Sequence, residues 1–400
     1  MDPSAGASPF FGERFHRDPA AVYRRLRRDH GPVAPIQLEG GVPAWCVLGY
    51  REVHHVVGNP ELFTRDPRRW NQWHRVPEDW SLRAYVEPRP SALLADVHEH
   101  RTRAPVVHDA LATVDPFEIS GAVERICDTL IDRFAGRGFA DLVVEYTHQI
   151  PLLAMAKIYG LPDDDVPMLT HDVALSGQEG EEAVRAHERT VRRMLRLVRE
   201  RRADPSGDLV SYLVEHPIGF SEDEIAADLF ITLGKAHLTT SDWMANALRL
   251  MLTEARFAID LAGGRGSVGH ALNEVLWEDT PTQNQVGRWA NQDVQLGGKP
   301  IRRGDLLVLG LAAANADPQV RPHGHEGATG NHAHLSFSHG EYGCPYAAQE
   351  IARTITTTGI EVLLDRLPDT TLGVDPEDLT WRPSLLMRGL TSLPVTFAPH

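Results

Sequence analysis

One cysteine of this 400-residue chain stands in a setting that could do chemistry. Cys344 follows a loop with two glycines, Gly340 and Gly343, and comes just before a helical pattern that starts at Tyr346. The N–H groups and the dipole at a helix start favour an anion, so a thiolate is stabilised there. Loop N–H groups can also donate to the sulfur and so tune a metal bound to it. Taken alone, the pattern fits an inert buried cysteine at a helix start better than a reactive one.

Histidines supply a second set of candidate ligands. The pairs His323 and His325, and His332 and His334, are each separated by one residue, which puts two imidazoles on one face of an extended segment. No carboxylate or cysteine completes an obvious set. Metal binding by this stretch is therefore the weaker alternative.

Composition limits the class of protein. The net charge is −15 without a basic block, which argues against a nucleic-acid binder. Three cysteines, Cys46, Cys127 and Cys344, lie far apart, so we expect no disulfide framework and a reducing compartment. The N-terminus has no signal-peptide pattern, and no apolar run approaches the roughly 18 residues of a membrane span. We expect a cytoplasmic protein with no membrane contact.

Apolar spacing and turn residues predict a mainly α chain with small β-sheets. Residues 1–95 read as mixed α/β, 96–262 as helical, and 263–400 as mixed again. A long loop or broken helix is expected at 65–92. Elements are expected at 20–28, 33–38, 45–48, 50–57, 123–134, 143–159, 181–202, 221–252, 270–277 and 346–364, with strand-like segments in 284–310 and 385–397.

The order of these segments matches a known family. Phe337-x-x-Gly340-x-x-x-Cys344 resembles the haem-binding loop of cytochromes P-450. The resemblance runs along nearly the whole chain. It includes Asp18-Pro19, Val42-Pro43-Ala44-Trp45, Asn59-Pro60-Glu61-Leu62-Phe63, Leu296-Gly297-Gly298, Ala313-Ala314-Asn315-Ala316-Asp317-Pro318 and Arg388-Gly389-Leu390. It implies one domain, 1–400, with the triangular P-450 fold and a haem-ligand loop at 334–346.

The resemblance also implies a cofactor site. Haem b would lie between the long central helix and the cysteine-loop helix, with the Cys344 thiolate as axial ligand of the iron. His100 and Arg288 match residues that bind the haem propionates, and Tyr342 stands where a propionate-binding His or Arg is common. His334 and Phe337 belong to the same haem-binding loop. Thr239 matches the threonine that helps deliver protons to dioxygen.

Several positions depart from the family pattern. The family's Glu-x-x-Arg pair reads Glu274-Val275-Leu276-Trp277 here, as in a subset of actinobacterial members that also read Cys-Pro-Tyr. A buried Glu274 without a cation would be costly. We predict that it finds another donor: Arg321, a histidine or backbone N–H groups. The arginine expected four residues after His100 is Ala104, although Arg101 and Arg103 lie nearby.

The long helix also departs from the family. Its Ala-Gly-x-acid-Thr pattern reads Lys235-Ala236-His237-Leu238-Thr239, so the hydroxyl is kept and the acid is lost. His237 and Asp242 are nearby titratable groups, but their place in a helix does not show that either faces the iron. The loss leaves three alternatives open: a peroxide-driven reaction, a substrate that supplies the proton relay, or no oxidation.

Two functions follow from the resemblance. One is a monooxygenase acting on a small apolar or polyketide-like metabolite, with electrons from NAD(P)H through separate, ferredoxin-type redox partners. The other is a haem-binding regulatory protein with little or no activity and a signalling-protein partner, since some members of the subset are encoded beside signalling GTPase systems. The monooxygenase is the leading hypothesis and the regulatory protein the alternative, although the missing acid and arginine favour the alternative over a generic enzyme.

Overall fold

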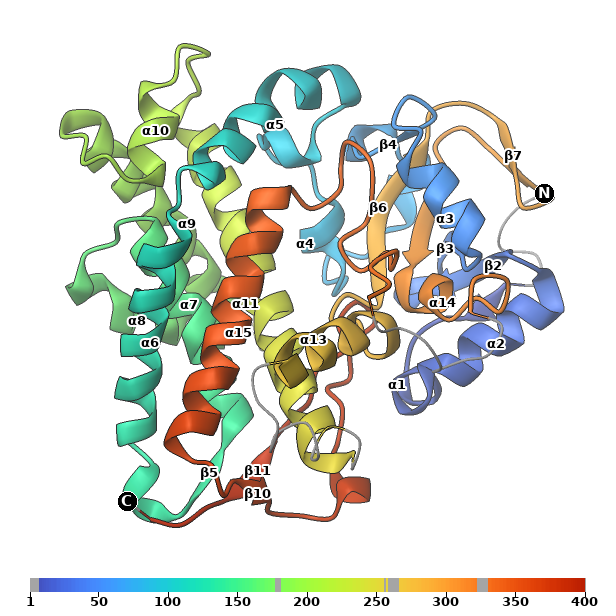
Figure 1. The fold of residues 1–400 in the computed structure, drawn as a ribbon. Coiled ribbons are helices and arrows are strands. Elements are labelled where there is room, and N and C mark those ends of the chain that lie inside the picture. The colour runs from blue at the N-terminus through green and yellow to red at the C-terminus, as the bar shows by residue number, and fades with distance from the viewer. Residues whose placement is uncertain (1–6, 177–180, 255–256, 258–265, 322–329, 400) are drawn as a thin grey trace.

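The computed structural model describes residues 7–176, 181–254, 257, 266–321 and 330–399. A group of long helices lies beside a smaller region built around a β-sheet (Figure 1). The helices of the first region are α5 Val97–Ala112, α6 Pro116–Asp132, α7 Gln149–Ile158, α8 Val166–Ser176, α9 Glu181–Ala203, α10 Leu209–Glu215, α11 Glu222–Thr253, α13 Gly266–Glu278 and α15 Tyr346–Arg366. Shorter helices accompany the sheet: α1 Glu13–Arg17, α2 Pro19–His30, α3 Tyr50–Val57, α4 Arg83–Val86 and α14 Leu311–Asn315.

The main sheet has six strands in the order β1-β2-β3-β9-β6-β4. Their bounds are β1 Ser8–Pro9, β2 Val33–Leu38, β3 Val42–Val47, β4 Phe63–Thr64, β6 Asn284–Ala290 and β9 Leu306–Gly310. Strands from both ends of the sequence therefore share one sheet. The edge strand β4 runs antiparallel to β6, with Phe63 opposite Ala290 and Thr64 opposite Trp289.

Helix α11 crosses the helical region and packs against α7, α9, α13 and α15. It begins with a capping box in which Ser221 and Glu224 satisfy each other's backbone N–H groups. Residues 240–248 are buried on every side of the helix, so packing rather than local propensity holds so long a helix. Helix α15 lies beside it in the middle of Figure 1 and begins directly after Cys344 and Pro345.

The structure confirms a mainly α fold with small sheets and most predicted elements. The β2–β3 hairpin turns at Glu39–Gly41, where Gly40 has a φ of 72° that favours glycine. Residues 65–92 form short helical turns joined by irregular backbone, as predicted for a broken helix. No helix in the described ranges is long and apolar enough to cross a membrane.

Two details differ from the prediction. Strand β5, Phe139–Asp141, interrupts the region expected to be helical, because it pairs with β11, Pro394–Thr396, far along the chain. Three residues carry no readable periodicity, so this pairing was invisible in the sequence. The predicted helix at 143–159 begins with a π-helical turn, Val143–Thr147, before α7. The remaining strands are β7 Val294–Leu296, β8 Lys299–Ile301 and β10 Thr371–Leu372.

Candidate functional site

The loop before α15 holds Cys344 in a fixed position. The Cys344 N–H donates to the Phe337 carbonyl at 2.9 Å, and the Gly343 N–H donates to the Gly340 carbonyl at 2.9 Å. Gly340 has a φ of 71°, and a Cβ there would lie 2.5 Å from the Val57 carbonyl oxygen. Only glycine fits this close approach, so the loop geometry depends on the residue that the sequence places there.

Cys344 differs from the other two cysteines because it keeps accessible surface, while Cys46 and Cys127 are buried. Burial nevertheless raises the pKa of Cys344 to about 11, and the nearby charge of Lys235 opposes this rise. The helix start alone therefore does not produce a thiolate, contrary to the simplest expectation from the sequence. A cation at the sulfur would offset the cost of the negative charge, so the position suits a metal ligand.

Two arginines lie buried side by side where β4 ends against β6. Arg288 is 0% exposed, and its Nε and both Nη atoms have no partner among the described residues. Arg65 is 7% exposed, and its Nε also has no partner there. The register of Thr64 with Trp289 brings the next residue, Arg65, alongside Arg288.

These two guanidinium groups are costly in the protein alone. Burial lowers the pKa of Arg65 to about 10. Burial and then the charge of Arg65 lower the pKa of Arg288 well below its usual value. Two buried like charges without a counter-ion in the described part of the chain require an anion. The site therefore fits a ligand that carries carboxylate groups.

Tyr342 supports Arg288 rather than offering its own hydroxyl. The Tyr342 hydroxyl donates to the Ala95 carbonyl at 3.0 Å. The guanidinium carbon of Arg288 lies 4.8 Å from the centre of the Tyr342 ring. The centres of the His100 and Tyr342 rings are 4.2 Å apart. Tyr342 thus fixes the position of the arginine through its ring.

His100 lies next to these residues, but its ring nitrogens already face protein atoms. Nδ1 is 2.9 Å from the Ala92 carbonyl oxygen, and Nε2 is 2.9 Å from that of Glu341. Burial lowers the pKa of His100, and a neutral ring donates to one carbonyl only. Arg101 donates a hydrogen bond to the Glu341 carboxylate, and Arg103 forms ion pairs with carboxylates of α5 and α11. Arg101 and Arg103 are thus held by carboxylates, whereas no such partner holds Arg65 in the described part of the chain.

Phe337 and His334 pack together in the cysteine loop. Their ring centres are 5.8 Å apart, and Phe337 also lies 5.7 Å from Trp243 of α11. His334 lies edge-on to Trp277 at 5.8 Å, and its buried Nδ1 has no partner in the described ranges. Burial lowers the pKa of His334 to about 4, so the ring is neutral. Contact of either residue with haem stays a prediction.

On α11, Thr239 and Lys235 lie one turn apart on the same side of the helix. The Thr239 hydroxyl donates to the Lys235 carbonyl at 2.7 Å, which is a common arrangement inside helices. Arg65, Cys344 and Arg288 all lie close enough to influence the Lys235 side chain electrostatically. Lys235 therefore shares one space with the cysteine and the buried arginines, and the sequence prediction missed it.

His237 and Asp242 do not replace the missing acid. Asp242 is fully buried and receives two hydrogen bonds from Arg382, at 2.6 and 2.8 Å. The His237 Nε2 lies 2.9 Å from the His148 carbonyl oxygen. Both residues thus belong to a buried polar cluster with its own partners.

Trp277 stands where the family's Glu-x-x-Arg pattern has its arginine, and its contacts differ from an ion pair with Glu274. The Trp277 Nε1 donates to the Asn331 carbonyl at 2.9 Å, and the Arg321 guanidinium lies 5.2 Å from the centre of its ring. Arg321 forms an ion pair with Glu278, one turn further along α13 than Glu274. Glu274 is 6% exposed and is not without an interaction partner. Trp277 therefore packs against Arg321, which pairs with Glu278, and the donor predicted for Glu274 stays a prediction.

Other candidate ligands contribute less. His323 and His325 lie outside the described residues. Within the described ranges, no three His, Cys, Asp or Glu side chains come together as metal ligands.

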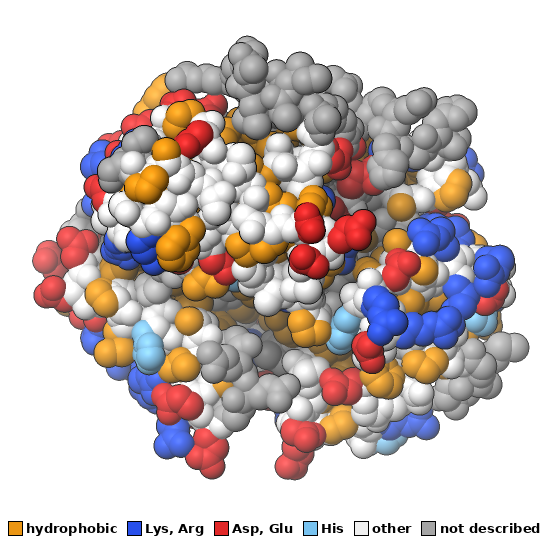
Figure 2. All heavy atoms as spheres, turned by 90° about the horizontal axis from the view of Figure 1, so that it is seen from below, with side chains coloured by type: hydrophobic (Ala, Val, Ile, Leu, Met, Phe, Trp, Pro, Cys, Tyr) orange, Lys and Arg blue, Asp and Glu red, His pale blue; other side chains and the backbone are white. Residues whose placement is uncertain are grey.

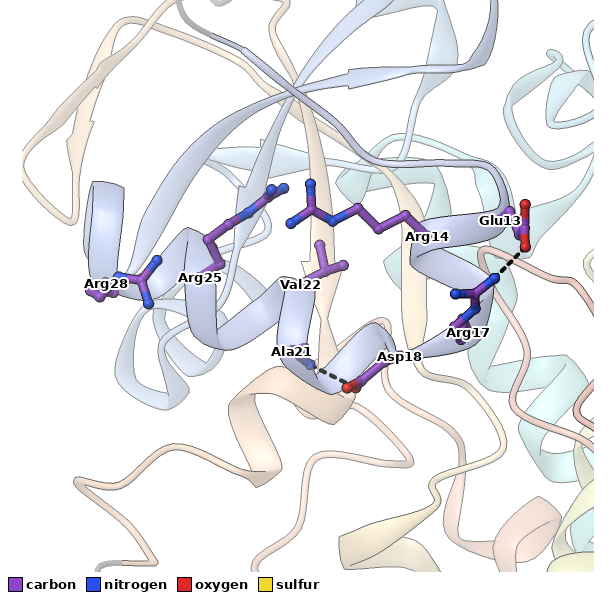
Figure 3. Close-up of a pocket in the computed structure, with 8 residues that line it drawn as sticks. All are labelled: Glu13, Arg14, Arg17, Asp18, Ala21, Val22, Arg25 and Arg28. Carbon is purple, nitrogen blue, oxygen red and sulfur yellow. Dashed lines mark hydrogen bonds and ion pairs between the residues drawn. The ribbon is translucent and has the colours of Figure 1, made fainter. Parts of the chain in front are cut away.

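A surface hollow of about 500 Å³ lies over α1 and α2, and Figure 3 shows Arg14, Arg17, Arg25 and Arg28 around it. Figure 2 shows basic side chains gathered toward one edge of the face seen from below, among acidic and hydrophobic ones. The Arg17 side chain is 76% exposed. Such solvated charges differ from the buried pair of Arg65 and Arg288.

Known proteins resemble this chain along nearly its whole length, although no protein-family model matches it. "Cytochrome P450 107B1" of Saccharopolyspora erythraea is 29% identical over 395 residues, covering 96% of each chain. "Vitamin D(3) 25-hydroxylase" of Pseudonocardia autotrophica is 28% identical, covering 98% of this chain and 96% of its own. The solved structure of CYP154C4 from a Streptomyces species, 24% identical, superimposes with a TM-score of 0.88 over 98% of each chain.

Proposed function

This chain belongs to the cytochrome P450 family, and we propose that it is a haem-thiolate monooxygenase that oxidises a small organic metabolite with dioxygen and electrons from separate redox partners. Haem b is the cofactor of this family. The observation that carries the proposal is the pair of buried, unpartnered guanidinium groups of Arg65 and Arg288 near an accessible Cys344.

The residues present fit haem b. The Cys344 sulfur would bind the iron, and Arg65 and Arg288 would bind the two propionate groups. Tyr342 would hold Arg288 in place through its ring. Bound there, the haem would supply dioxygen binding and one-electron chemistry, with the thiolate favouring cleavage of the O–O bond.

Proton delivery depends on few groups in this chain. Thr239 keeps a hydroxyl on the side of α11 that carries Lys235. Leu238 replaces the acid, and the carboxylate of Asp242 is held by Arg382. A weak proton relay favours a second candidate function: a haem-binding regulatory protein with little monooxygenase activity. The comparisons give no support to a signalling-protein partner for it.

The substrate and the electron donor belong to the proposal. One relative is named a vitamin D(3) 25-hydroxylase, and another, from Bacillus subtilis, is named for polyketide biosynthesis. We infer a small, largely apolar metabolite of comparable kind. A ferredoxin-type protein would supply the electrons.

Two measurements test the proposal. The reduced, carbon monoxide-bound protein should show the thiolate-type absorption band. Cys344→Ser should remove this band, while the control Cys127→Ala should keep it. A histidine-type spectrum in the unaltered protein would refute thiolate ligation.

Turnover with a surrogate ferredoxin and its reductase, or with peroxide, then separates the two functions. A hydroxylated product from a panel of steroids and macrolides is expected. No product from either electron source, with the thiolate band intact, would favour the regulatory protein.

A further inference from the structure

We propose that the side-chain amine of Lys235 binds the haem iron on the face opposite Cys344, so that the resting protein has one nitrogen and one sulfur axial ligand. The inference rests on the proposed haem site. It assigns to this chain a second iron ligand in the helix that covers the cofactor.

The position of Lys235 supports this assignment. Helix α11 packs against α15, which begins just after Cys344. The Lys235 side chain lies within electrostatic range of Cys344, which would hold the iron, and of Arg65 and Arg288, which would bind the propionates. A group that interacts with all three lies over the space that the haem would fill.

The surroundings of Lys235 leave its amine without a protein partner. No hydrogen bond or ion pair joins the amine to another residue in the described part of the chain. Asp228, the carboxylate that most affects Lys235, accepts a hydrogen bond from Ser91. The amine is therefore available to a ligand.

Lys235 and Cys344 both keep accessible surface. Burial is nevertheless the largest cause of the pKa shift of each group, and it lowers the pKa of Lys235 to about 7. A side chain that is accessible yet strongly desolvated borders an internal recess.

The choice of lysine is also informative. The chain has 40 Lys and Arg residues, and only Lys157, Lys235 and Lys299 are lysines. Arginine stays protonated in proteins and has no lone pair for iron, whereas a buried lysine readily loses its proton. Position 235 therefore carries lysine, the basic residue type that can bind iron, and not arginine.

Absorption and electron paramagnetic resonance spectra of the ferric protein test the assignment. The unaltered protein should be low-spin, with the red-shifted band of a nitrogen-ligated haem thiolate. Lys235→Met and Lys235→Arg should both lose this band, because neither side chain offers an amine lone pair. The control Lys157→Met changes an exposed lysine of α7 and should keep it.

Imidazole binding gives a quantitative readout. If the amine occupies the iron 90–99% of the time, removing it should tighten imidazole binding by about 10- to 100-fold. A nitrogen-type spectrum that persists in Lys235→Met, or a water-ligated spectrum and unchanged imidazole affinity in both proteins, would overturn the assignment.

Labelling avoids dependence on a variant that might not fold. In the unaltered holoprotein grown with ¹⁵N-lysine, pulsed resonance spectra should show a ¹⁵N nucleus coupled directly to the iron. Absence of that coupling would overturn the assignment. The reduced, carbon monoxide-bound band reports separately on Cys344, so failure of the proposed haem-thiolate site is distinguishable from failure of the Lys235 ligand.

Discussion

Replacing Arg288 should change the apoprotein and the holoprotein in opposite directions. In the protein alone, Arg288 is a fully buried cation beside Arg65, with no partner among the described residues. With haem bound, the same cation would pair with a propionate. Arg288→Met fills a similar volume without charge, so it should stabilise the empty form and destabilise the loaded one.

The size of the effect follows from burial. An unpaired buried charge costs several kcal/mol, so Arg288→Met should raise the free energy of unfolding of the apoprotein by about 1–3 kcal/mol. Loss of a charge-assisted hydrogen bond should lower that of the holoprotein by about 2 kcal/mol. The difference corresponds to a loss of haem affinity of about 3–5 kcal/mol, or about 100- to 5,000-fold.

Haem transfer to excess apomyoglobin measures the loss of affinity, and thermal denaturation of the haem-free protein measures the gain in stability. Arg388→Met is the control, because Arg388 is a half-buried arginine that pairs with Asp279 at 3.3 Å, whereas Arg288 is fully buried. That variant should destabilise both forms alike. Equal destabilisation of both forms by Arg288→Met, or an unchanged rate of haem transfer, would refute the reasoning.

Three further changes have defined outcomes. Burial lowers the pKa of His237 to about 4, so the folded protein should lose up to about 3 kcal/mol of stability as pH falls from 6.5 to 4. His237→Gln should flatten this dependence in melts between pH 7.5 and 4.5, and an unchanged slope would contradict it. Gly340→Ala should lower the holoprotein melting temperature, because its Cβ would meet the Val57 carbonyl oxygen at 2.5 Å; an unchanged melting temperature would show that the loop adapts. Arg321→Leu should lower the free energy of unfolding by about 1–3 kcal/mol, because it removes the partner of Glu278. Denaturant titration measures this change, and a decrease of less than about 0.5 kcal/mol would argue against a stabilising ion pair.

The sequence predicted those parts of the fold that local pattern determines. The β2–β3 hairpin, α3, α11 and α15 all follow from turn residues, caps and apolar periodicity. Strand β5 did not, because its partner lies some 250 residues away and three residues carry no periodic signal.

The site shows the same division. Cys344 and Arg288 stand in motifs that can be read along the chain. The position of Arg65 beside Arg288 becomes apparent only from the register of β4 on β6, which no local sequence pattern predicts. A signal did exist for Lys235: a lone lysine within the segment aligned on Thr239. Helical spacing alone could not show that it shares a space with Cys344.

The arrangement of Arg65 and Arg288 has a consequence for the life of the protein in a cell. A chain that has not yet acquired its cofactor keeps two repelling cations inside its sheet edge, which favours local opening there. Proteases act on opened states, so unloaded molecules should be removed faster than loaded ones. The abundance of the protein would then follow the supply of haem, without any dedicated sensor.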